Sequence, residues 1–502
     1  MSNWGLSRRD FLKLGGMLPG AALLGRDYLV TVGEELPSFI ILVFDALSAH
    51  DLSVYGYSRD TAPNLTRFAN RALVYHQHSS AGNYTTPGTA SLLTGMVPWT
   101  HRALNQSSRM RADLGHRNVF SALGPRWNRY GFAQNPWADL FLHQFSRDVD
   151  THLPVRSFGA ISPWLTGDGL EDGYLAYQAL DSFLFSKTEI PGSMFFALGE
   201  RIYGSRFLRG VSAKDYPRGY PEVVTGPFSY RLDDLVSGVA DFCRQMRPPF
   251  LAYLHLQPPH EPYRATKAYS GFFNDDVVGI AKPRHRLVIS PDSEEHLATR
   301  RAGYDRFIAN LDAELGKLLE TLEESGLFNH CYVLLTSDHG EMFERGQRGH
   351  STPLLYEPVI HIPLLIAGPR IERRVDIQTP TSAVDILPSV LHLAGQPVPS
   401  WCEGHVLPGL GFAAESERVI FAVEAKSSPA NRPLTRATAS IRQGPYKLIY
   451  YRGYEEENAA ELYNLEQDPE ELEDLHAVLP GVAASLEEVL LEHWERADLD
   501  YA

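Results

Sequence analysis

The chain has 502 residues, which exceeds the usual size of one domain and allows a large buried core. With 44% hydrophobic and 21% charged residues, its composition is ordinary for a soluble globular protein. Lys plus Arg total 46 against 61 for Asp plus Glu, a net charge of −15, and this balance argues against a nucleic-acid partner, which requires a basic surface. The three cysteines are too few and too scattered for a disulfide framework or a cysteine-based zinc site.

The first 25 residues form a separate segment, 1–25. Ser7 precedes the adjacent pair Arg8 and Arg9, Phe-Leu-Lys follows shortly after, and an apolar stretch then runs from Leu14 to Gly25. This pattern resembles a twin-arginine signal and predicts export to the periplasm or another extracytoplasmic space by the twin-arginine machinery; a plain basic tail is the alternative. The stretch is shorter than the roughly 20 residues that span a bilayer, and no clear cleavage site follows, so an uncleaved segment would tether the protein to the membrane.

Continuous apolar runs predict strands that are buried on both faces of a parallel sheet. The runs are Ser38–Phe44, Phe250–Leu254, Cys331–Leu335 and Pro363–Ala367. Between the second and third, apolar residues recur at helical spacing from Tyr304 to Leu322, and Gly326 supplies a stop. The alternation predicts an α/β fold with a mostly parallel central sheet flanked by helices. Ligands of such sheets bind beyond the carboxyl ends of the strands, which makes the polar residues that follow the runs the candidates for a site.

A Pro- and Gly-rich stretch at 396–404 predicts a boundary in the chain. Strand-like segments follow at Val419–Val423, Ala439–Arg442 and Lys447–Tyr451, and an amphipathic helix at Val482–Trp494. We therefore expect a catalytic domain over 36–395 and a small C-terminal α+β subdomain over 396–502. Upstream, the aromatic-rich stretch from Trp127 to Trp137 could line a sugar or lipid pocket, but packing beneath an insertion is the simpler interpretation.

Two of the predicted strand ends carry potential metal ligands. Asp45 follows the first run, and Asp338-His339 follow the third. Either group could instead stabilise a turn, which is the commoner role of a lone Asp-His pair. Two such strand ends together favour a divalent cation, and the mixture of carboxylate and imidazole suits Zn²⁺ or Mn²⁺.

Residues 85–95 are typical of a helix start. Pro87 fits the first helical position, and a threonine before it fits the cap. Helix N-termini bind anions, and a threonine hydroxyl becomes a useful nucleophile where a bound metal stabilises its alkoxide. A capped helix without chemistry is the alternative.

The same residues resemble the sulfatase signature, Cys-x-Pro-Ser-Arg followed by x-x-Leu-x-Thr-Gly, with Thr85 in the nucleophile position. Further segments resemble this family in its own order: 39–57, 350–369, 382–399 and 460–476. The resemblance implies a sulfatase-like fold of the alkaline phosphatase superfamily and a divalent metal ion (Zn²⁺, Mn²⁺ or Ca²⁺). It also implies that the ligands of this ion are Asp45, Thr85, Asp338 and His339.

The departures from the family pattern bear on the reaction. Classical sulfatases convert a cysteine or serine to formylglycine, where this chain has Thr85; Thr89 replaces the signature arginine, and Ala46 replaces the second aspartate of the opening pair. Asp338-His339 replaces the usual Asp-Asn pair, as in phosphate-processing relatives that use a threonine or serine nucleophile. A formylglycine hydrate expels sulfate by regenerating its aldehyde, whereas a threonine ester must be cleaved by attack at phosphorus or sulfur.

Two histidines complete the candidate site. His260 resembles the family's His-x-Pro segment and is expected to bind the transferred group or protonate the leaving oxygen, and His350 is expected to do the same or to hold a second metal. His255 is expected in the core, and Glu341 is expected to orient His339 or to decorate a helix cap.

The sequence thus predicts hydrolysis or transfer of phosphoric or sulfuric esters through a covalent threonine intermediate. Phosphoesters are favoured, and the substrate is expected to be a small-molecule, glycan or lipid ester. A true sulfuric ester hydrolase and a catalytically silent binding protein are the alternatives. The second gains weight because the chain lacks the signature arginine and the second aspartate of the opening pair, and because the lysine of the family's Gly-Lys-Trp-His motif is not evident after residue 101.

Overall fold

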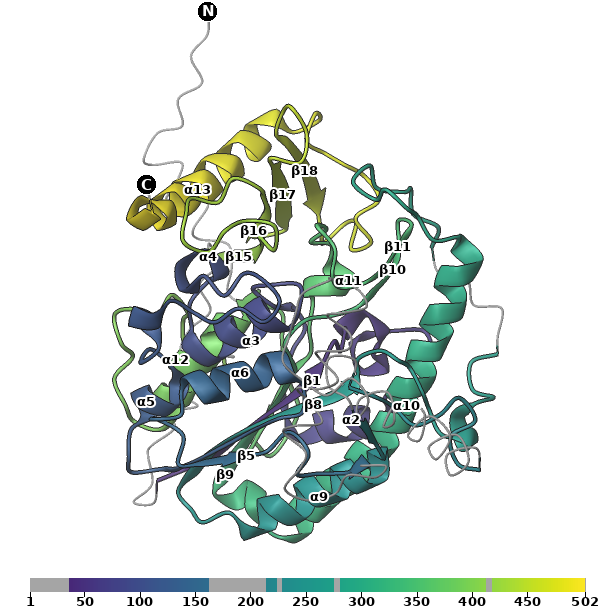
Figure 1. Ribbon diagram of the computed structural model, residues 1–502, viewed down its shortest axis with the longest axis vertical. Helices are drawn as coiled ribbons and strands as arrows, with labels where there is room; N and C mark the ends of the chain where they lie inside the picture. The colour runs from purple at the N-terminus through teal and green to yellow at the C-terminus, as the bar shows by residue number, and fades with distance from the viewer. Residues whose placement is uncertain (1–35, 162–213, 224–227, 275–279, 412–417, 502) are drawn as a thin grey trace, which may run out of the picture.

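The computed structural model describes residues 36–161, 214–223, 228–274, 280–411 and 418–501 (Figure 1). The segment predicted as a twin-arginine signal, 1–25, lies outside these residues. Among the described residues, none of the helices is both long and apolar enough to cross a membrane.

An eight-stranded sheet forms the centre of the molecule, in the order β13-β2-β12-β9-β1-β8-β4-β5. Its strands are β1 (Ser38–Asp45), β2 (Leu73–Tyr75), β4 (Asn128–Ala133), β5 (Thr151–Leu153), β8 (Phe250–Pro259), β9 (Cys331–Ser337), β12 (Leu364–Ala367) and β13 (Val375–Ile377). β1 pairs in parallel with both β8 and β9, and the parallel pairing continues through β4 to β5. β12 is antiparallel to β9 and to β2, so the predicted mostly parallel sheet is confirmed, with one reversed strand.

Helices cover both faces of this sheet, as Figure 1 shows. They are α2 (Pro63–Phe68), α9 (Leu232–Gln245) and α10 (Glu294–Glu324) on one face, and α3 (Thr85–Thr94), α5 (Val119–Leu123), α6 (Pro136–Gln144) and α12 (Ile386–Leu393) on the other. Successive side chains of a strand point to opposite faces. Accordingly Ile40, Leu42 and Phe44 of β1 pack against the first group of helices, while Phe39, Ile41 and Val43 pack against the second.

The predicted helix that ends near Gly326 is α10, which begins earlier than its apolar pattern indicates. Ser293 caps it, its hydroxyl accepting a hydrogen bond from the backbone N–H of His296. The exposed first turns carry charged residues, which explains why the apolar periodicity starts only at Tyr304.

The C-terminal residues form a second, antiparallel sheet covered by one helix, as expected for a small α+β unit. Its strands are β15 (Val419–Glu424), β16 (Ala437–Gln443), β17 (Tyr446–Arg452) and β18 (Ala459–Asn464), and the helix is α13 (Pro480–Asp498). Trp494 and Leu490 of α13 pack on this sheet together with Trp99 of α4 (Pro98–His101), which joins the two units. Leu407 and Leu410, beyond the predicted boundary at 396–404, still pack in the core of the large unit.

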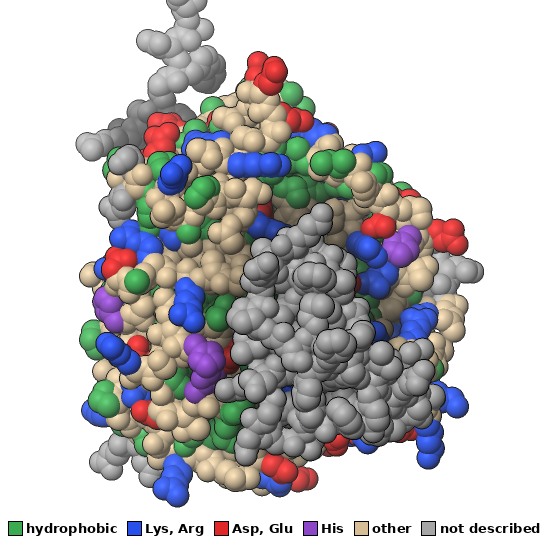
Figure 2. All heavy atoms as spheres, viewed as in Figure 1, with side chains coloured by type: hydrophobic (Ala, Val, Ile, Leu, Met, Phe, Trp, Pro, Cys, Tyr) green, Lys and Arg blue, Asp and Glu red, His purple; other side chains and the backbone are tan. Residues whose placement is uncertain are grey.

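The remaining elements are short. They are β3 (His78–Ser79), β6 (Ala160–Ile161), β7 (Ser229–Tyr230), β10 (Met342–Glu344), β11 (Gln347–Gly349), α11 (Glu357–Ile360) and β14 (Thr381–Ser382). On the face that Figure 2 shows, Lys and Arg side chains are interspersed with Asp and Glu.

Candidate active site

Two aspartates meet where β1 and β9 end. Asp45 is the last residue of β1, and Asp338 follows the last residue of β9, Ser337, which pairs with Phe44. Because the strands are parallel, their carboxyl ends share one edge of the sheet. Both carboxylates are fully buried, and the structure therefore brings together the two strand ends that the sequence singles out.

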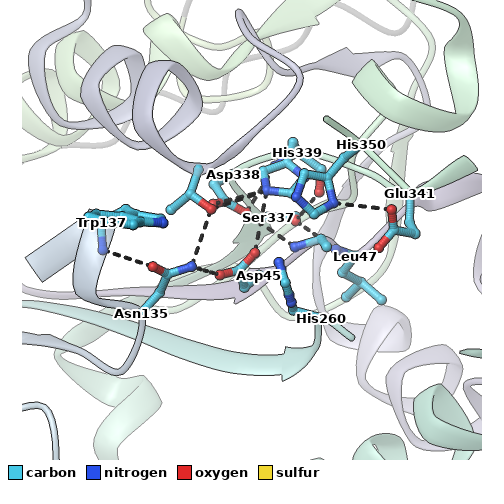
Figure 3. A network of polar contacts seen from close by, with 12 residues as sticks. Asp45, Leu47, Asn135, Trp137, His260, Ser337, Asp338, His339, Glu341 and His350 are labelled. Carbon is cyan, nitrogen blue, oxygen red and sulfur yellow. Dashed lines mark hydrogen bonds and ion pairs between the residues drawn. The ribbon is translucent and has the colours of Figure 1, made fainter. Parts of the chain in front are cut away.

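Two imidazoles lie against these carboxylates (Figure 3 shows one of them, His339). Nε2 of His339 is 3.4 Å from Asp45 Oδ1 and 3.6 Å from Asp338 Oδ2. Nε2 of His255 is 3.6 Å from Asp45 Oδ2 and 3.7 Å from Asp338 Oδ2. His255 is buried as expected, but it belongs to the site rather than to the apolar core. Its position in β8, next to β1, turns its ring toward the aspartates.

Each imidazole is oriented through its other nitrogen. His339 Nδ1 lies 2.9 Å from the carbonyl oxygen of Gly340, to which it donates, so that Nε2 keeps its lone pair. His255 Nδ1 lies 2.9 Å from the hydroxyl of Tyr253. Both Nε2 atoms are therefore held facing the carboxylates.

This cluster fits a divalent cation. Asp45 Oδ1, Asp338 Oδ2 and His255 Nε2 are buried without a hydrogen-bond partner among the described residues, and ligand atoms of these three residues lie within 4.8 Å of one another. An unpaired buried polar atom is costly, and a cation would satisfy all three at once. Two carboxylates and two imidazoles suit Zn²⁺ or Mn²⁺ better than Ca²⁺, which prefers oxygen ligands.

Burial and neighbouring charges shift the pKa values of the ionisable groups in this cluster. Burial and the neighbouring Asp45 raise the pKa of Asp338. Burial lowers the pKa of His339, but the charges of Asp338 and Asp45 outweigh it and raise this pKa to about 9. Burial also acts to raise the pKa of Asp45, yet the surrounding histidines hold it well below its ordinary value.

Thr85 places its hydroxyl beside this cluster. Its Oγ1 is 3.4 Å from His339 Nε2 and accepts a hydrogen bond of 3.2 Å from Asn135 Nδ2. Tyr84 is the N-cap of α3 and Thr85 its first residue, so the prediction that a threonine caps the helix and Pro87 begins it is wrong by two positions. The helix lies close to the end of β9, since a Cβ on Gly88 would come within 2.2 Å of the Asp338 carbonyl oxygen.

Asn135 is a site residue that the sequence analysis missed. It is the N-cap of α6, where its Oδ1 accepts a hydrogen bond of 2.8 Å from the N–H of Trp137, while its Nδ2 donates both to Asp45 and to Thr85 (Figure 3). The signal in the sequence is an Asn-Pro pair directly after a strand, β4, which is typical of a helix start at the carboxyl edge of a sheet.

The two predicted catalytic histidines lie together above the cluster. The ring centroids of His260 and His350 are 4.9 Å apart, and those of His350 and His339 are 4.3 Å apart. Glu341 accepts from His350 Nδ1 at 3.1 Å and from the Tyr263 hydroxyl at 2.9 Å. It thus orients His350, and not His339 as expected from its position in the sequence.

The environments of these histidines move their pKa values in opposite directions. Burial acts to lower the pKa of His260, but Asp45 and Glu341 outweigh it and raise this pKa. Burial lowers the pKa of His350 despite the nearby Glu341. The two neighbouring imidazoles therefore differ in how readily each holds a proton.

A cavity of about 240 Å³ opens onto the site. Thr85, Asn135, His260 and His350 line it, together with the partly exposed Trp137 and the guanidinium groups of Arg300 and Arg348. Trp127 and Phe132, from the same aromatic-rich stretch as Trp137, are buried in the core and agree with the packing interpretation.

Comparisons with known proteins agree on a family. Residues 37–396 match the family described as Sulfatase, and residues 349–494 match N-sulphoglucosamine sulphohydrolase, C-terminal. A choline-sulfatase of Rhizobium meliloti (strain 1021) is 24% identical over 94% of this chain and 89% of its own length. Arylsulfatase K of Bos taurus is 30% identical over 65% of this chain and 68% of its own. The structure of a phosphonate monoester hydrolase of Agrobacterium radiobacter aligns with a TM-score of 0.66 at 20% identity, covering 93% of this chain and 97% of the other.

Proposed function

This chain belongs to the sulfatase family and is an ester hydrolase, and we propose that it acts on phosphoric esters through a covalent intermediate on Thr85. The observation that carries the proposal is the position of the Thr85 hydroxyl, 3.4 Å from His339 Nε2 beside two buried carboxylates with unpaired oxygens. We infer that the ligands of the metal are Asp45, Asp338, His339 and Thr85, with His255 added by its geometry.

A divalent cation bound there would favour the alkoxide of Thr85 and neutralise charge on the ester. Thr85 Oγ1, held by Asn135 at the positive end of α3, attacks phosphorus, and its proton passes to solvent in the cavity. The bond to the leaving oxygen breaks as His260, which lines the cavity, donates a proton to that oxygen. Water or an acceptor alcohol then attacks the phosphorus of the phosphothreonine and gives up its proton to His260, which the first step left without that proton. The bond between phosphorus and Thr85 Oγ1 breaks, and this oxygen takes a proton back from solvent in the cavity.

Phosphoesters are favoured over sulfate esters by the nucleophile. A threonine carries a single oxygen, so its sulfate ester has no elimination route of the kind open to a formylglycine hydrate and requires a second attack at sulfur. The structural similarity to a phosphonate monoester hydrolase supports this preference, whereas the similarity to a choline-sulfatase favours the alternative, hydrolysis of sulfuric esters. The cavity, with Trp137 beside Arg300 and Arg348, suits an anionic ester with an apolar or glycan leaving group.

The test uses the full chain, an aryl phosphodiester, an aryl phosphate and an aryl sulfate. We expect higher kcat/KM on a phosphoester, and intact mass spectrometry of the quenched enzyme to find one phosphoryl group on Thr85. Thr85→Ala should lose the adduct and at least about 10³-fold in kcat/KM, as expected when the covalent route is removed. Thr85→Ser should keep the adduct.

Thr86→Val is the matched control, because Thr86 is the next residue of α3, equally buried, and its hydroxyl has no hydrogen-bond partner among the described residues. Greater efficiency on the sulfate ester would contradict the substrate class. No adduct and unchanged activity in Thr85→Ala would contradict the mechanism and favour a silent binding protein.

We also propose export by the twin-arginine machinery, on the pattern around Arg8 and Arg9. Replacing both arginines by lysine in the full chain should leave the protein in the cytoplasm of a host with this machinery, as measured by cell fractionation. An unchanged extracytoplasmic fraction would contradict the proposal.

A further inference from the structure

A second group of potential metal ligands lies away from the active site. His50, Glu357 and His361 each offer one ligand atom, and these atoms lie within 4.8 Å of one another. His50 belongs to a 3-10 turn after β1, Ala49–Asp51, and Glu357 begins α11, which is followed by His361. The three line a cavity of about 570 Å³ that shares no lining residue with the cavity over Thr85.

The backbone and one ring nitrogen hold this group in place. His361 Nε2 is 2.9 Å from the carbonyl oxygen of His76, to which it donates, and its Nδ1 therefore keeps the lone pair that a metal requires. The N–H of Ala49 donates to the carbonyl oxygen of His361 at 3.0 Å, which fixes the two histidine-bearing segments against each other. The two rings are perpendicular, with centroids 5.3 Å apart.

Glu357 adds a carboxylate to the two imidazoles of this group. Glu357 Oε1 accepts from Lys447 Nζ at 2.7 Å, and a carboxylate has a second oxygen to offer.

The surrounding cavity leaves room for a further ligand. Both histidines are partly exposed to it, and Arg301, Arg442 and Glu470 also line it. Two imidazoles and one carboxylate, with an open position, form a three-ligand set that binds Zn²⁺ in other proteins. Guanidinium groups nearby favour an anionic oxygen in the open position.

We propose that His50, Glu357 and His361 form a second divalent metal site of the zinc type, with one coordination position open to this cavity. The site connects the segment that follows Asp45 with α11, and α11 is bonded through Glu357 to Lys447 of the C-terminal sheet. A bound ion would therefore stabilise the junction between the two units, where Figure 1 places α11.

Aromatic packing alone is the competing explanation, because His361 also contacts Tyr55, and Tyr55 contacts His76. Packing requires the rings but no cation. Zinc uptake therefore separates the two explanations.

The experiment counts zinc bound to the chelator-treated full chain by competition with a chromophoric chelator. Another cluster, Asp139, His143 and His152, also brings three ligand atoms within 4.8 Å of one another and could contribute to the count. The count is therefore made in wild type and in a background of Asp45→Asn, Asp338→Asn and His143→Gln. We expect the background protein to bind one equivalent of zinc. This equivalent should be lost when His50→Gln or His361→Gln is added to the background. Either change made in the wild-type chain should lower the zinc count by one equivalent.

His76→Gln is the matched control. His76 lines the same cavity but points its Nε2 at Asp376, 2.6 Å away, and the variant should bind zinc as its parent does. Substitution with Co²⁺ adds a spectroscopic readout, since visible absorption of the background protein should vanish in His50→Gln. Unchanged zinc uptake in both histidine variants, an equal loss in His76→Gln, or no uptake in a background protein that circular dichroism shows to be folded would overturn the proposal.

Discussion

Substitutions of Asn135 can separate the role of this residue in the reaction from its role in the stability of the fold. The side chain caps α6 through Oδ1 and donates to Asp45 and Thr85 through Nδ2. Asn135→Ser keeps a capping oxygen but is too short to reach the other two residues, whereas Asn135→Ala removes both functions. A hydrogen bond to a charged group contributes about 1.5–3 kcal/mol, so both variants should lose about 10- to 150-fold in kcat/KM in the metal-loaded enzyme.

The stabilities of the two variants should differ. Loss of an N-cap costs about 1 kcal/mol, and serine caps a helix about as well as asparagine does. Urea denaturation should therefore place Asn135→Ala about 1 kcal/mol below Asn135→Ser in free energy of unfolding, while the two have similar kcat/KM on an aryl phosphoester. Wild-type activity in Asn135→Ser would refute the role of Nδ2 in catalysis and leave Asn135 as a helix cap alone.

Three other measurements test the structure. Burial lowers the pKa of His101, which contacts Ser91 of α3, to about 3. The stability that this buried, neutral histidine contributes is fully present above pH 6.5 and is lost as the pH falls toward 3. In His101→Gln the free energy of unfolding should therefore fall less steeply on acidification than in wild type. The difference in slope should be up to about 1.4 kcal/mol per pH unit, measured by denaturation at a series of pH values. Lys447→Met removes the ammonium group that contacts both buried Glu357 and buried Glu471, and it should cost the metal-free protein about 3–5 kcal/mol in the same assay. A change under about 1 kcal/mol would contradict the importance of these ion pairs. Chelation should abolish ester hydrolysis, with Zn²⁺ or Mn²⁺ restoring more activity than Ca²⁺ because imidazole ligands favour the former; equal recovery with Ca²⁺ would argue against the two histidines as ligands.

The sheet and its two aspartates were predictable because burial on both faces leaves a clear apolar run in the sequence. Such a run locates the strand and its carboxyl end, where Asp45 is the last residue of β1 and Asp338 follows the last residue of β9. It does not give strand direction, since β12 is as apolar as β9 yet antiparallel to it. Direction depends on the connection between the strands, which a single apolar run does not encode.

The site residues that the sequence did not reveal take part in the site through contacts with residues that are distant in the chain. His255 lies inside a strand of ten residues, β8, where a histidine is usually part of the core. Its role comes from the adjacent β1, which ends beside it. Asn135 follows β4, and it reaches Asp45 because β4 pairs with β8, which in turn pairs with β1. Glu341 was expected to orient the adjacent His339, but the hairpin of β10 and β11 brings His350 to it instead.

The two buried carboxylates explain why the hydroxyl of Thr85, the first residue of α3, matters for more than helix formation. Two carboxylates without solvent repel each other, and the described residues leave one oxygen of each unpaired. Helix N-termini alone cannot compensate for this, because α3 and α6 each contribute only a partial positive charge. A divalent cation at the centre of the cluster would balance both carboxylates, and Thr85 Oγ1 lies close to the groups that would surround it. Under the proposed function, a cation at this sheet edge would activate the Thr85 hydroxyl that the start of α3 brings to it.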